Sequence, residues 1–160
     1  MPSTYLGDSD RVVRFVPWGK LRKDEDDNVL GVLGVAFALR DGEAGLSVTW
    51  CEYFKGTSDE MLRCAIEAIR NSDMKVGAKA QFSVAQVEYL KSFASENGKK
   101  FRFIHEPEDD NAAHAAVRGW IRPEEDDLLE LIAEDYWCEL IDKSTADQLP
   151  LCDCEARIVK

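Results

Sequence analysis

The sequence predicts a single α+β domain with a mainly antiparallel or mixed sheet of about five to six strands and about three helices. Two observations support this fold class. The chain has 160 residues, which suits one domain, and no repeat or linker divides it. Several strand-like segments follow one another directly, whereas a doubly wound fold needs strict alternation of strand and helix. We expect a flexible N-terminus over residues 1–10 and the domain over 11–160.

Three strands are predicted in the first third of the chain. Residues 11–16, RVVRFV, are rich in β-branched side chains, which is typical of a strand. The proline, glycine and charged residues that follow predict a loop. Residues 32–40 are a short apolar run, which is either a buried strand or a short helix. Residues 46–54, LSVTWCEYF, alternate in polarity and predict a strand with one buried face.

Two helices are predicted from capping patterns. Thr57 and Glu60 have the spacing of a capping box, and apolar residues at helical spacing follow them. After a predicted strand over residues 74–84, Ser83 and Gln86 repeat the capping-box spacing. The second helix then ends at an Asn-Gly pair, the usual place for a left-handed cap.

The last part of the chain predicts two strands and a third helix. Residues 100–107 and 114–121 are rich in aromatic, small and β-branched side chains, which favours strands. Pro123 suits the first helical position, and the four acidic residues after it suit the positive end of the helix dipole. This helix is predicted to run to about residue 143.

Charge limits the possible partners. The formal net charge is −11 at pH 7, so direct binding of nucleic acid or an anionic membrane surface is disfavoured. No apolar run is long enough to span a membrane, and the first residues do not have the pattern of a signal peptide. We therefore expect a cytoplasmic protein whose partners are basic or neutral proteins or small molecules, with a homo-oligomer as a further option.

Five cysteines occur at irregular spacing, which does not suggest a disulfide framework. We expect most to be free thiols, with Cys51 buried and inert because its sequence neighbours would not lower its pKa. Cys152 and Cys154 could join His105 and His114 in a four-ligand zinc site, but no standard ligand spacing supports it. The sequence therefore predicts no metal and no cofactor.

The candidate catalytic residues are His114, Arg118 and Arg14. A histidine titrates near neutral pH, so His114 is either a general base or a strand residue bonded to the backbone. As a base it would need an orienting acid such as Asp109 or Asp110 and a nucleophile such as Cys51. An arginine in an apolar strand is either paired with a carboxylate or holds an anionic ligand in a cleft.

Trp18, Trp50 and Trp120 are the candidate binding residues, because aromatic side chains near arginines suit a nucleotide pocket or a protein hot spot. Acidic clusters at 23–28, 106–111 and 123–127 lack the spacing of a calcium loop. They are either solvated surface or an imitation of a phosphate backbone.

In the stretches LSVTWCEYF (46–54), LRCAIEAIR (62–70) and NAAHAAVRGW (111–120), the chain resembles a group of small bacterial accessory- or mobile-gene proteins with no agreed activity. The resemblance would cover roughly residues 11–155. It implies a bacterial, cytosolic and defence- or mobile-element-linked role, and it assigns no catalytic residue.

Three functional hypotheses follow. The first is a protein-binding subunit, accessory, inhibitory or antitoxin-like, which acts on a basic partner. The second is a small enzyme that uses His114 and Arg118, with Arg14, on an anionic or nucleotide-like substrate. The third is a nucleic-acid mimic, which would need carboxylates at regular spacing across one face.

Overall fold

The computed structural model describes residues 4–151 and confirms the α+β class. It contains a six-stranded antiparallel sheet and a two-stranded hairpin. The strands are β1 (Arg11–Val16), β2 (Leu21–Lys23), β3 (Val29–Val32), β4 (Gly45–Trp50), β5 (Gln81–Gln86), β6 (Arg102–His105), β7 (His114–Arg118) and β8 (Glu139–Ile141). The helices are α1 (Ser58–Arg70), α2 (Val87–Glu96), α3 (Asp126–Asp135) and α4 (Lys143–Gln148), with 3₁₀ turns η1 (Trp18–Lys20), η2 (Gly34–Phe37) and η3 (Cys51–Tyr53).

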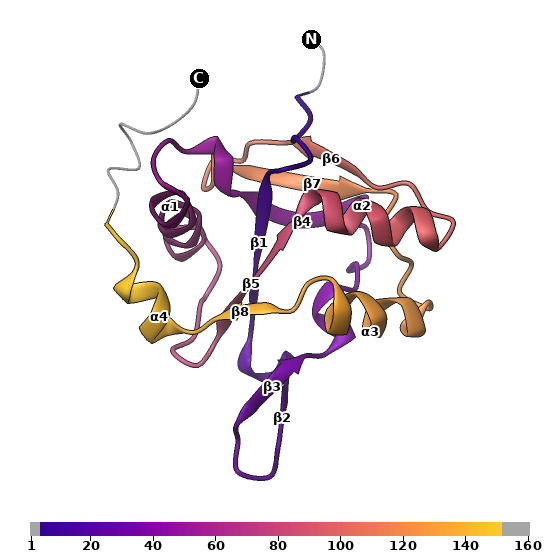
Figure 1. Ribbon diagram of the computed structural model, residues 1–160, viewed down its shortest axis with the longest axis horizontal. Helices are drawn as coiled ribbons and strands as arrows, with labels where there is room; N and C mark the ends of the chain where they lie inside the picture. The colour runs from indigo at the N-terminus through magenta and orange to yellow at the C-terminus, as the bar shows by residue number, and fades with distance from the viewer. Residues whose placement is uncertain (1–3, 152–160) are drawn as a thin grey trace.

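The large sheet has the strand order β6-β7-β4-β1-β5-β8, and helices cover both of its faces. Figure 1 shows α1 and α4 on one side and α2 and α3 on the other, with the β2–β3 hairpin projecting from the body. Each face of the sheet therefore buries its own layer of apolar side chains.

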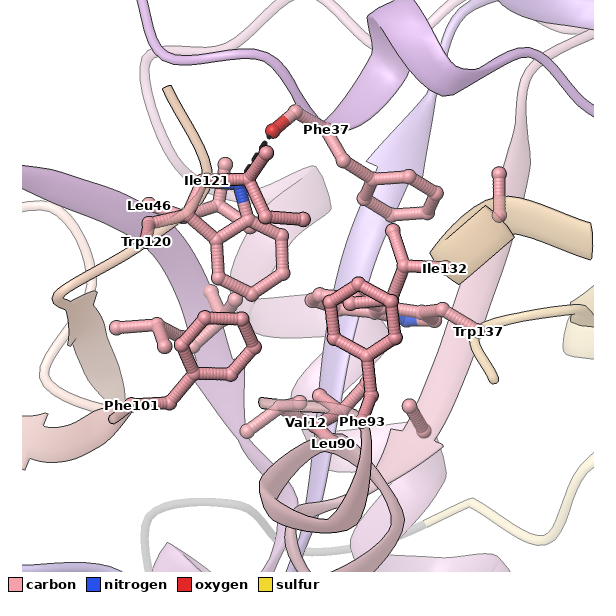
Figure 2. Packing of buried hydrophobic residues seen from close by; sticks show 14 of the residues in the cluster. Val12, Phe37, Leu46, Leu90, Phe93, Phe101, Trp120, Ile121, Ile132 and Trp137 are labelled. Carbon is pink, nitrogen blue, oxygen red and sulfur yellow. Dashed lines mark hydrogen bonds between the residues drawn. The ribbon is translucent and has the colours of Figure 1, made fainter. Parts of the chain in front are cut away.

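The larger core lies under α2 and α3 and is rich in aromatic residues. Figure 2 shows Phe37 and Trp137 packed together, with their ring centroids 4.6 Å apart. Trp120 lies beside Phe101 and donates a hydrogen bond of 2.6 Å to the carbonyl of Phe37. The indole N–H of Trp137 likewise donates to a backbone carbonyl, that of Ser83. Both buried indoles are thus paired, and pairing matters because a buried donor without an acceptor lowers stability.

The smaller core lies between the opposite face of the sheet and α1. Alternation along β1 divides its side chains, since Val12 and Val16 belong to the larger core and Val13 to the smaller one. The predicted strand over residues 11–16 is confirmed at both ends.

One predicted capping box is confirmed and the other is wrong. Thr57 accepts from the backbone N–H of Glu60, whose carboxylate accepts from the N–H of Thr57. Ser83 instead lies inside β5 and is fully buried, with its hydroxyl bonded to the carbonyl of Trp137. The helix after it begins at Val87 without a side-chain cap, because the β-sheet register with β1 extends through Gln86.

The helix predicted from Pro123 to about residue 143 is shorter at both ends, because α3 begins only at Asp126 and is followed by a strand. α3 ends at Asp135, β8 pairs with β5 over three residue pairs, and α4 follows. Trp137 explains the break, because its indole N–H donates to the carbonyl of Ser83 and its own carbonyl accepts from the Ser83 hydroxyl. These reciprocal bonds fix the chain beside β5 and favour a strand over a longer helix.

Several other elements are shorter than predicted. The apolar run at 32–40 contains only the last residue of β3 and the short turn η2, the strand expected over 46–54 ends at Trp50, and β5 begins only at Gln81. Asn97 and Gly98 end α2 as expected, with Gly98 at a φ of 70°.

The sheet opens between two central strands. β1 pairs with β4 only at Val12–Trp50 and Val13–Thr49, whereas it pairs with β5 along all six residues. β4 continues to pair with β7 from Gly45 to Thr49. Beyond Val13 the strands β1 and β4 therefore separate, and backbone groups on both sides need other partners.

The substitution Trp137→Phe tests the role of Trp137 in the fold. It removes the N–H donor to Ser83 while keeping an aromatic ring, so we expect the free energy of unfolding to fall by about 1–3 kcal/mol. Urea denaturation measures this value. Trp18→Phe is the matched control, because Trp18 is only partly buried, and its effect should stay below about 1 kcal/mol. Equal losses of unfolding free energy in the two variants would contradict the role given to Trp137 in the fold.

Candidate functional site

A cavity of about 310 Å³ lies where β1 and β4 separate. One wall comes from β1 and β4, and the rest comes from η1, η2, the turn after Ala38, the end of α1 and the loop before β7. The polar and charged lining residues are Arg14, Lys20, Arg40, Glu43, Ser47, Thr49, Ser72, Glu108, Asp110, Asn111 and His114. The site therefore combines residues that are up to a hundred positions apart in the chain.

Arg14 occupies the opening between the two strands. Its Nε–H donates to the carbonyl of Ala36 at 2.9 Å, and its Nη1 donates to the carbonyl of Ser47 at 2.7 Å. These two bonds replace part of the missing β-sheet pairing. Gly34 helps to place the first acceptor, since a Cβ at Gly34 would lie only 2.7 Å from the backbone nitrogen of Glu130.

The guanidinium of Arg14 retains unused hydrogen-bonding capacity. An arginine has five N–H donors, and the two bonds above leave one on Nη1 and both on Nη2 without a partner among the described residues. No carboxylate of residues 4–151 lies within ion-pairing distance of it. Burial lowers the pKa of Arg14 to about 10, which Glu43 partly opposes, so the group stays charged at neutral pH.

Two more cations line the same cavity. Burial, followed by repulsion from Arg14 and Arg40, lowers the pKa of Lys20. Arg14, Lys20 and Arg40 thus place three positive groups around one cavity. Glu43 is the acid on this side, and it accepts a hydrogen bond from the backbone N–H of Arg40.

The opposite wall contains His114 and the loop that precedes it. The Nδ1 of His114 lies 2.7 Å from the carbonyl oxygen of Glu106. Because a carbonyl oxygen can only accept, Nδ1 carries a hydrogen and donates this hydrogen bond. The buried Nε2 has no hydrogen-bond partner within residues 4–151, and a carboxylate oxygen of Glu108 lies 3.7 Å from it. Asn111 is buried and donates to the hydroxyl of Thr49 at 3.0 Å.

The structure thus brings together two of the three candidate catalytic residues. Arg14 and His114 both line the cavity, whereas Arg118 does not and pairs instead with Glu106 through two hydrogen bonds. Neither Asp109 nor Asp110 orients His114, because the backbone carbonyl of Glu106 does so. Cys51 is fully buried, and burial raises the pKa of its thiol, which agrees with the expected inert role.

The three candidate tryptophans lie in separate places, and none lines the cavity. Trp18 packs with Lys23 and Lys79, at 4.3 and 5.2 Å from its ring centroid. Trp50 donates to the carboxylate of Asp10 at 3.0 Å, and Trp120 is part of the core.

The cysteine and metal expectations are tested only in part. Cys51 is buried and Cys138 is exposed, and both carry free thiols. Cys152 and Cys154 lie outside the described residues. Within residues 4–151, no group of three or more His, Cys, Asp or Glu side chains is arranged to hold a metal ion.

Sequence reasoning missed Lys20, Arg40 and Asn111. Lys20 and Arg40 lie in segments that read as loop or turn, where charged residues are common. Their proximity depends on the turns that follow β1 and precede β4. No local pattern carries that information.

Comparison with known proteins adds no relative. No protein-family model, curated protein or solved structure matches the chain. None of the helices in the part of the chain that the structure describes is long and apolar enough to cross a membrane.

The two strand arginines should differ in their effect on stability. Arg14→Met leaves the carbonyls of Ala36 and Ser47 without their donor, so we expect a loss of about 1–3 kcal/mol in the free energy of unfolding. Arg118→Met removes only a half-exposed ion pair, so we expect a loss of about 0–1 kcal/mol. Chemical denaturation of both variants checks this. A larger loss for Arg118→Met would contradict the structural role given to Arg14.

Proposed function

We propose that the protein binds a small anionic molecule, carrying a carboxylate or phosphate group, in the cavity between β1 and β4. The main support for this proposal is the state of the Arg14 guanidinium. It lines the cavity with free N–H groups and has no carboxylate partner among the described residues. A guanidinium in this state matches two oxygens of such an anion.

The surrounding charges support this binding mode. Lys20 and Arg40 place two further positive groups on the cavity wall. A bound anion would relieve the repulsion among the three cations, so it gains more from this site than from an isolated surface lysine. Hydroxyl and amide groups of Ser47, Thr49 and Asn111 would hydrogen-bond the rest of the ligand.

The far wall limits what the ligand carries at its other end. Glu108 and Asp110 lie there, so we expect the ligand to be anionic at one end and neutral or cationic at the other. The role of His114 is to hold the loop by its bond to Glu106, and a base role would require exposure of its Nε2.

Calorimetric titration with adenosine monophosphate, inorganic phosphate and succinate tests the proposal. We expect at least one of these probes to bind, and Arg40→Met and Lys20→Met each to weaken it by about five- to tenfold, because each removes one charged contact. Arg122→Met is the matched control, because it removes the same charge from an exposed position outside the cavity. Binding that none of the cavity variants changes, or no binding of any probe, would contradict the proposal.

A further inference from the structure

A second concave surface lies between β3 and β8 and shares no lining residue with the cavity. This groove encloses about 680 Å³. All four residues of β3 line it, together with Leu140 of β8 and the two residues that flank this strand, Cys138 and Asp142. Gln81 at the start of β5 and the last turn of α3 also line it.

Both strands present an unpaired edge at this groove. β8 is the outermost strand of the large sheet and pairs only with β5, and β3 pairs only with β2. An exposed strand edge offers backbone N–H and C=O groups to another extended chain. Figure 1 shows the hairpin projecting from the body next to β8, and the last turn of α3 also lines the groove.

The groove is acidic and has one exposed apolar residue. Asp27, Glu134 and Asp142 line it against a single cation, Arg22, which already pairs with Glu130 and Glu134. Leu30, in the middle of β3, is 64% exposed. A complementary partner therefore carries positive charge and alternate apolar side chains.

From these observations we infer that the groove binds an extended basic segment of another protein by β-strand addition. The segment pairs with the free edge of β8 or β3, its cationic side chains face Asp27 and Glu134, and an apolar side chain covers Leu30. This inference goes beyond anion binding and is independent of Arg14. The acidic net charge led us to expect a basic protein partner, and this groove is the surface where such a partner would bind.

Fluorescence polarisation with a labelled heptapeptide of alternating lysine and valine tests the inference. A peptide of alternating glutamate and valine is the charge control. We expect the basic peptide to bind, and Asp27→Asn combined with Glu134→Gln to weaken it by about five- to tenfold. The control variant, Glu88→Gln with Asp109→Asn, removes two exposed acids outside the groove and should bind as the unmodified protein does.

N-methylation of the peptide separates strand addition from simple charge attraction. A strand that pairs along one edge uses the N–H groups of alternate residues, so one of the two alternating N-methylated series should lose binding and the other should keep it. Loss in both series indicates insertion between both edges, which also supports the inference. Retention in both series, equal binding of the acidic peptide, no binding at all, or concentration-dependent self-association that blocks the peptide would overturn it.

Discussion

The incomplete pairing of β1 with β4 is the constraint on which the candidate site depends. A central sheet strand normally satisfies its backbone groups along its whole length, but these two strands share only two residue pairs. Arg14 spans the opening and donates to carbonyls from η2 and β4. The same side chain therefore completes the fold locally and faces the cavity that the opening creates.

Net charge and local charge give different information about this molecule. A net charge of −11 disfavours a long polyanion, whose many charges sample the whole surface. A single carboxylate or phosphate inside the cavity interacts mainly with Arg14, Lys20 and Arg40, because nearby partly buried charges are screened less than distant surface ones. The acidic groove between β3 and β8 shows the opposite local balance, so the two concave surfaces are suited to ligands of opposite charge.

Acidic clusters named from the sequence lie in three separate parts of the fold, namely the hairpin turn, the loop before β7 and the start of α3. Their carboxylates partly serve local structure. Asp24 accepts hydrogen bonds from Asp26 and Asn28 within its own turn, and Glu125 accepts from Lys99 at 2.7 Å. Hydrogen bonding to Lys99 and to the backbone of Arg122 lowers the pKa of Glu125 to about 2.

Local patterns predicted the elements whose stabilising contacts are local. The capping box at Thr57 and the glycine cap after α2 lie within a few residues of their partners, so the sequence shows them directly. The box at Ser83 and the long third helix failed because distant contacts override local preference, through the register with β1 and the bonds to Trp137. Arg14 and His114 were found because a charged or titratable residue in an apolar strand is conspicuous, whereas Lys20 and Arg40 in loops are not.

A crystal structure of the protein soaked with adenosine monophosphate tests the central claim most directly. Phosphate oxygens should lie within hydrogen-bond distance of Nη1 and Nη2 of Arg14, and the bonds of Arg14 to Ala36 and Ser47 should remain. A cavity in which the Glu43 carboxylate pairs with these nitrogens and excludes the phosphate would contradict it, because Arg14 would then be a purely structural ion pair.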